Sequence, residues 1–64
     1  MATVSVGRGT ISVSGSEGEG WYVYDTRGNL LDHRYYDGTV QVERPGVYIV
    51  QIGNRPSQKV VVKF

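Results

Sequence analysis

The feature that most constrains the fold of this chain is its division into short runs of β-branched and aromatic residues. Nine glycines and two prolines interrupt the 64 residues. No apolar run keeps the helical period of 3.6 residues long enough to give a helix one buried face. Runs rich in Val, Ile, Thr and Tyr between turn residues are typical of β-strands. The sequence therefore predicts an all-β fold.

Seven such runs predict strands: residues 3–6, 10–14, 21–24, 30–36, 39–43, 46–52 and 58–63. Seven short strands with frequent turns indicate two packed antiparallel sheets, so we expect a single domain, a small immunoglobulin-like β-sandwich, over residues 1–64. The chain has no cysteine and lacks the antibody Cys–Trp–Cys pattern. The prediction therefore concerns the architecture only, and a small open barrel is the alternative.

Period-two alternation predicts which side chains face the core. In the first two strands we expect Val4, Val6, Ile11 and Val13 on one buried face, with Ser and Thr facing solvent. In the last three strands the expected inward side chains are Val40, Val42, Tyr48, Val50, Ile52, Val60 and Val62.

Three connections carry specific signals. In the turn after residue 24, Asp25 can accept a backbone hydrogen bond and Gly28 can adopt a positive φ. Asp37-Gly38 is the strongest two-residue hairpin signal in the chain, so the strands on its two sides are expected to pair. Residues 15–20 are predicted to form a polar loop without core residues.

Charge and hydropathy exclude several functions. The net charge is +1, and the seven basic and six acidic residues are interleaved. No basic stripe can follow a phosphate backbone, so we expect no nucleic-acid partner. No apolar run approaches the roughly 20 residues that span a bilayer, so we expect no transmembrane segment. Residues 1–4 do not resemble a signal peptide. If the protein is exported, we expect this chain to be the C-terminal module of a larger protein.

The residue types that carry chemistry are not arranged for catalysis. His33 is the only histidine, whereas a metal site needs three or four ligands. Its neighbour Asp32 faces the other side of the sheet and cannot orient it as a base. No serine lies in a nucleophile elbow, and no two carboxylates are expected to pair inward. We therefore expect no enzymatic activity, no metal and no cofactor.

Aromatic residues are numerous for so short a chain. Period two places Trp21 on one face of its strand and Tyr22 and Tyr24 on the other. One set should fill the core. The other set can pack across strands, which we favour, or it can form an exposed platform of Tyr22, Tyr24 and Tyr36 for a sugar ring or a protein.

Three blocks of sequence suggest a family. Residues 21–31 hold a Tyr-Asp turn, a glycine and an apolar pair; residues 45–50 read Pro-Gly-Val-Tyr-Ile-Val; residues 59–63 read Lys-Val-Val-Val-Lys. In this order they resemble the C-terminal sorting domain of proteins exported by the type IX secretion system (Por secretion system) of Gram-negative bacteria. Asn29, where a basic residue is usual, and Trp21, where a smaller residue is usual, depart from the pattern.

The resemblance implies a noncatalytic sorting or anchoring module. It would direct an upstream passenger domain of the same chain through the periplasm and across the outer membrane to the cell surface, with the outer-membrane secretion machinery as partner. We expect recognition through the terminal hairpin, by Gly46, Val47, Tyr48, Lys59, Val61, Lys63 and Phe64. The alternatives are a carbohydrate- or protein-binding module that uses exposed aromatics, and an inert spacer domain.

Overall fold

The computed structural model describes residues 1–64 and contains seven β-strands. They are β1 (Thr3–Gly7), β2 (Thr10–Ser14), β3 (Trp21–Tyr24), β4 (Leu30–Arg34), β5 (Gly38–Gln41), β6 (Gly46–Ile52) and β7 (Gln58–Val62). No helix that could cross a membrane is present. Every expected strand exists, and most boundaries agree with the predicted ones within two residues.

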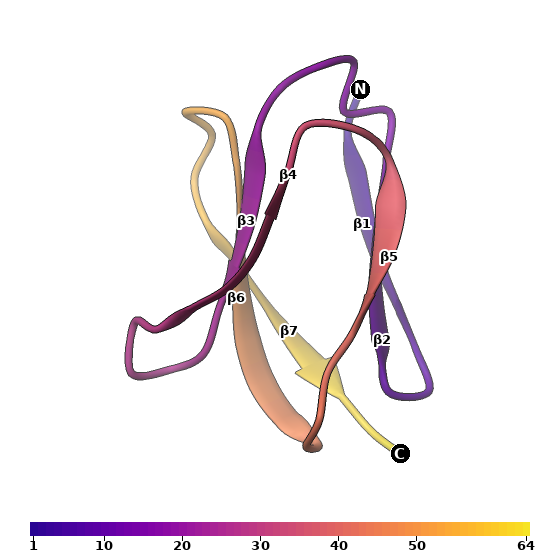
Figure 1. Ribbon diagram of the computed structural model, residues 1–64, viewed down its shortest axis with the longest axis vertical. Helices are drawn as coiled ribbons and strands as arrows, with labels where there is room; N and C mark the ends of the chain where they lie inside the picture. Colours follow the sequence, from indigo (N-terminus) through magenta and orange to yellow (C-terminus); the bar gives the residue numbers. More distant parts are fainter.

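The strands form two antiparallel sheets that face each other (Figure 1). One sheet has the order β1-β2-β5, and the other has the order β4-β3-β6-β7. This confirms the predicted immunoglobulin-like sandwich. The molecule is 28 Å long, and its two termini lie at opposite ends of that long axis (Figure 1).

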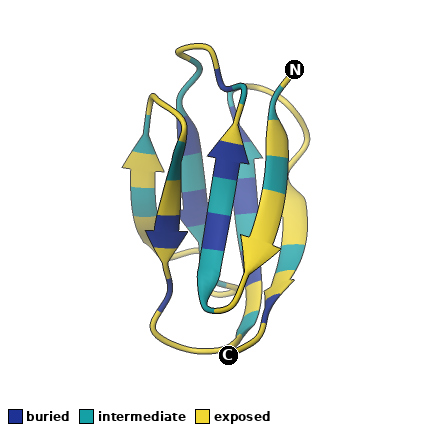
Figure 2. Cartoon of the chain, turned by 90° about the vertical axis from the view of Figure 1, so that its right-hand side faces the viewer, coloured by how far each residue is buried: buried dark blue, intermediate teal, exposed yellow.

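The core lies between the sheets and follows the predicted alternation. Buried and exposed residues alternate along the strands (Figure 2). Ten hydrophobic side chains are buried: Ile11, Val13, Trp21, Val23, Val40, Val42, Tyr48, Val50, Ile52 and Val62. Val4 and Val60 pack against them and are partly buried. The inward face predicted for the last three strands is therefore confirmed.

Two aromatic side chains in this core also use their polar atoms. The indole Nε1 of Trp21 donates a hydrogen bond to the carbonyl oxygen of Tyr36 at 3.0 Å. The hydroxyl of Tyr48 donates to the carbonyl oxygen of Arg44 at 2.5 Å. A tyrosine at the start of this strand that bonds back to the preceding corner is a hallmark of immunoglobulin-like sandwiches.

Val6 lies on the predicted face of β1, opposite Ile11, but the prediction that it is buried is wrong. Its side chain is 47% exposed, whereas its cross-strand partner Ile11 is fully buried. Val6 lies at the end of β1, a strand at the margin of its sheet, and the opposite strand β7 already ends at Val62. No strand therefore covers Val6.

The hairpin predicted at Asp37-Gly38 is also wrong. β4 ends at Arg34 rather than at Tyr36, and the following segment crosses to the other sheet, where β5 pairs with β2. The carboxylate of Asp37 explains the crossing, because it accepts hydrogen bonds from the backbone N–H groups of Gly15 and Ser16 and from the hydroxyl of Ser16. These bonds fasten the crossing segment to the β2–β3 loop.

The same contact corrects the expectation for residues 15–20. Ser16 is only 1% exposed, and its hydroxyl lies 2.8 Å from the Asp37 carboxylate. A buried hydroxyl needs such a partner, because an unpaired one loses its hydrogen bonds to water. The loop is therefore polar, as predicted, but it does contribute a buried residue.

Candidate functional site

The outer faces of the two sheets have opposite characters. The outer face of the three-stranded sheet carries hydroxyl and amide side chains: Thr3, Ser5, Thr10, Ser12, Ser14, Thr39 and Gln41. The outer face of the four-stranded sheet is mainly aromatic and aliphatic: Tyr22, Tyr24, Leu30, His33, Val47, Ile49, Gln51, Lys59 and Val61. Apolar residues gathered on a sheet face that no other element covers are typical of an interaction surface.

A column of rings crosses this apolar face. The rings of Tyr22 and His33 stack across β3 and β4 with centroids 4.1 Å apart and planes 10° apart. Tyr24 continues the column at 6.2 Å from Tyr22, and Tyr35 lies 4.9 Å from His33. The structure thus shows the cross-strand packing that we favoured, which occupies part of the ring faces.

The predicted platform is brought together only in part. Tyr22 and Tyr24 are neighbours in the column, but Tyr36 is not in it. Its side chain is 79% exposed in the bend after β4, and only its carbonyl oxygen is engaged, by Trp21. His33 and Tyr35 belong to the ring column but not to the predicted platform. Both side chains join the column because Tyr22 pairs with His33 across β3 and β4. This pairing could have been predicted by assuming a register for the β3–β4 hairpin.

The terminal hairpin places the predicted recognition residues on different surfaces. Val47 and Val61 lie opposite each other on β6 and β7, and both are exposed. Lys59, Lys63 and Phe64 are also exposed. Gly46 is half-buried at the start of β6. Tyr48, in contrast, is only 8% exposed and faces the core, so its ring is not part of the outer surface.

The end of the chain meets the β1–β2 turn. The N–H of Gly9 donates to the carbonyl oxygen of Lys63 at 2.9 Å, and the ring of Phe64 lies so close to Gly9 that an added Cβ would come within 3.4 Å of it. A hollow of about 420 Å³ opens beside this contact. We call it the C-terminal hollow, and its lining is Val6, Gly7, Arg8, Val61, Lys63 and Phe64.

Val6 and Arg8 also line this hollow, and they were not among the predicted recognition residues. They are separated from Val61 by most of the chain. Only the packing of β1 beside β7 brings the two segments together. No local pattern signals such an approach, because it depends on how the two sheets stack.

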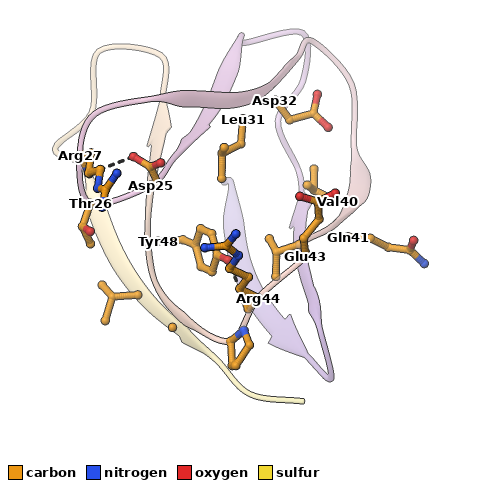
Figure 3. A pocket seen from close by; sticks show the side chains of 14 residues that line it. Asp25, Thr26, Arg27, Leu31, Asp32, Val40, Gln41, Glu43, Arg44 and Tyr48 are labelled. Atoms are coloured by element: carbon orange, nitrogen blue, oxygen red, sulfur yellow. Dashed lines mark hydrogen bonds between the residues drawn. The ribbon is translucent and has the colours of Figure 1, made fainter.

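A larger groove of about 760 Å³ lies between the two sheets on the side of β4 and β5 (Figure 3). An irregularity in the β3–β4 pairing opens it: Tyr24 pairs with Leu30 and Val23 with Asp32, so Leu31 is left unpaired. Leu31 then lines the groove together with Val40 and Tyr48. Bulges often redirect a side chain in this way.

The charged groups around this groove have mixed signs and mainly structural contacts. The carboxylate of Asp25 accepts hydrogen bonds from the side chain and backbone of Asn29 and from the backbone of Arg27. These bonds, first of all that from the Asn29 side chain, lower the pKa of Asp25. Asp32 pairs with Arg34 at 3.2 Å. The lining includes no His, Cys or Ser side chain.

The structure brings together no group of three or more His, Cys, Asp and Glu side chains that could hold a metal ion. Comparisons with models of protein families, with curated proteins and with solved structures found no match for this chain. The family resemblance therefore depends on the three sequence blocks alone.

Proposed function

We propose that this chain is a noncatalytic sorting or anchoring module that directs an upstream passenger across the outer membrane to the cell surface. The proposal includes the outer-membrane secretion machinery as the partner and the terminal hairpin as the main recognised element. It rests on the resemblance of three sequence blocks to type IX sorting domains, and two features of the fold support it.

The first feature is the position of the three blocks in space. They supply β3, β6 and β7, which are consecutive neighbours in the four-stranded sheet. Blocks that are separated by up to 27 residues of sequence thus form one continuous surface. A partner that binds this surface would contact all three blocks at once. This would explain why the three blocks occur together in one sequence.

The position of β7 gives further support. It lies at the margin of its sheet, and its only strand partner is β6. A margin strand exposes backbone groups that can pair with a strand of another protein. Lys59 and Lys63 flank it with charge, which keeps such a strand soluble until a specific partner binds.

The test is an export assay with the whole chain. Residues 1–64 are fused to the C-terminus of a periplasmic fluorescent reporter, because β1 is part of the sheet that a shorter fusion would lack. In a host that has the secretion system the reporter should reach the medium or the cell surface. It should stay in the periplasm of a strain without the outer-membrane translocon. Retention of a folded fusion in both strains would refute the proposal.

The apolar outer face favours a second candidate, a carbohydrate- or protein-binding module. Tyr24 and Tyr35 end the ring column, and each keeps part of its surface free for a ligand. A glycan panel tested by NMR should then shift the signals of Tyr24 and Tyr35. Trp21 is fully buried, so its fluorescence would not report such binding. Unchanged tyrosine signals across the panel would remove the carbohydrate version of this candidate.

A further inference from the structure

The charged side chains that line the C-terminal hollow are all basic, whereas those that line the larger groove have mixed signs. Arg8 and Lys63 line the hollow, and no Asp or Glu side chain does. Lys59 follows on the same side of the terminal strand, two residues before Val61. None of these three cations forms an ion pair within the molecule. The chain as a whole has a net charge of only +1, so this cluster of unpaired cations is confined to one part of its surface.

Apolar side chains lie between these cations. Val6 is 47% exposed, and Val61 and Phe64 are each 55% exposed. The exposure of Val6 is the one departure from the predicted inward face of β1. In the C-terminal hollow, this exposed side chain adds to the apolar surface that is open to a partner. The hollow of about 420 Å³ between these side chains can receive an apolar group.

The spacing of the groups specifies the partner further. Lys59, Val61 and Lys63 alternate with period two, so the two lysines are about 13 Å apart in an extended strand, with Val61 midway. An extended peptide has the same period. Acidic side chains at its first and fifth positions would meet the lysines, while an apolar side chain at its third position would enter the hollow beside Val61.

We propose that the C-terminal hollow binds an acidic polypeptide segment in extended conformation, with two carboxylates four residues apart and an apolar side chain midway. This inference rests on the proposed sorting function in one respect, namely that the acidic segment belongs to the export machinery. The binding of such a segment to the hollow does not depend on that function. Charge complementarity selects an acidic partner. The unpaired backbone of β7 favours a polypeptide over a lipid surface, because only a polypeptide can extend the sheet.

The first test is NMR titration of the whole chain with the peptide acetyl-Glu-Thr-Leu-Thr-Glu-amide. The amide signals of Val6, Arg8, Val61 and Lys63 should shift, and affinity should fall with added salt. A peptide of the same composition with adjacent glutamates, acetyl-Glu-Glu-Thr-Leu-Thr-amide, should bind more weakly. Equal binding of the two peptides, or shifts confined to other surfaces, would overturn the proposal.

Matched variants locate the site. Reversing two exposed cations, Arg8→Glu with Lys63→Glu, should weaken binding at least about tenfold. The same variant should gain affinity for the lysine version of the peptide. Arg55→Gln, which removes an exposed cation from the β6–β7 turn, should leave binding unchanged. A reversed variant that is folded by NMR and binds the acidic peptide like the wild type would contradict the inference.

Two further measurements separate the possible partners and the two proposals. Vesicles that contain phosphatidylglycerol should not compete with the peptide; if they bind through Arg8 and Lys63 and the peptide does not, the partner is a membrane and the inference is wrong. The reversed variant is then tested in the export assay. Peptide binding by a wild-type fusion that is not exported refutes the sorting function alone. Normal export of the reversed variant refutes the acidic partner alone.

Discussion

A single hydroxyl group joins the core of this molecule to one of its connections. The ring of Tyr48 packs between the sheets, while its hydroxyl reaches the carbonyl oxygen of Arg44 in the segment between β5 and β6. The sequence predicted the inward direction of the ring, since that follows from period two. It did not predict the hydrogen bond, which depends on the path of the preceding segment.

Removing this hydroxyl should weaken the fold without disturbing its packing. Tyr48→Phe keeps the ring and loses the hydrogen bond, so the free energy of unfolding should fall by about 1 kcal/mol. Urea denaturation, followed by the fluorescence of the buried Trp21, measures the change. Tyr36→Phe is the control, because that side chain is exposed and its hydroxyl makes no hydrogen bond to the protein. If both variants lose the same free energy of unfolding, the hydrogen bond of the Tyr48 hydroxyl does not stabilise the fold.

The second residue-scale prediction concerns acid stability. Hydrogen bonds from the backbone N–H and hydroxyl of Ser16, and then from the backbone N–H of Gly15, lower the pKa of Asp37 from its ordinary value of 3.8. A carboxyl group whose pKa is lower in the folded state contributes stability above its unfolded pKa and loses it as the pH falls through the folded pKa. The free energy of unfolding should therefore decrease as the pH falls below about 4.

Asp37→Asn tests the origin of this pH dependence. The variant should be less stable than the wild type at pH 7, and the difference should shrink as the pH falls below 3.8. Urea midpoints measured between pH 2 and 7 give both curves. Glu43→Gln is the control, because its exposed carboxylate accepts no hydrogen bond from the protein. A constant difference between wild type and Asp37→Asn at all pH values would contradict this assignment.

At the scale of elements, local patterns determined the strands but not all of their partners. Alternating apolar residues and turn residues are short-range signals, and they predicted the β3–β4 turn correctly: Asp25 accepts the backbone bonds and Gly28 has a φ of +87°. The Asp37-Gly38 signal failed because the Asp37 side chain bonds to a loop about twenty residues earlier. Such a contact is invisible in any local window.

The β3–β4 turn offers an element-scale test. At the positive φ of Gly28 an L-residue is strained, although the surrounding space is open. Gly28→Ala should lower the free energy of unfolding by about 1–2 kcal/mol. Gly28→Asn should cost less, because asparagine adopts this conformation more readily. Urea denaturation of both variants gives the order. A larger loss in Gly28→Asn would show that the strain is not the cause.

At the scale of the whole molecule, a sandwich of this size has a small margin of stability. A chain of 64 residues should unfold with a free energy of about 3–10 kcal/mol. The period-two pattern was sufficient to predict two sheets and most of the core. It could not predict that β1 and its turn approach the end of the chain, because the stacking of two sheets depends on the summed packing of all strands.

Removing one central side chain should therefore affect the whole molecule. Ile52 is 2% exposed, and Ile52→Ala should lower the free energy of unfolding by about 3 kcal/mol, a large fraction of the total. Val61→Ala removes an exposed side chain from the neighbouring strand and should cost less than about 0.5 kcal/mol. Thermal unfolding by circular dichroism compares the two. Similar losses would indicate that the outer face contributes to stability as much as the core.

The opposite positions of the two termini have a mechanical consequence. β1 begins at one end of the long axis, and the chain leaves β7 at the other end. A force between the termini therefore pulls β1 along β2 and β7 along β6, parallel to the strands. Ladder hydrogen bonds lie perpendicular to antiparallel strands, so this load acts on all bonds of a ladder together rather than on one after another. A domain of modest thermodynamic stability can in this way resist a pull from a tethered neighbour.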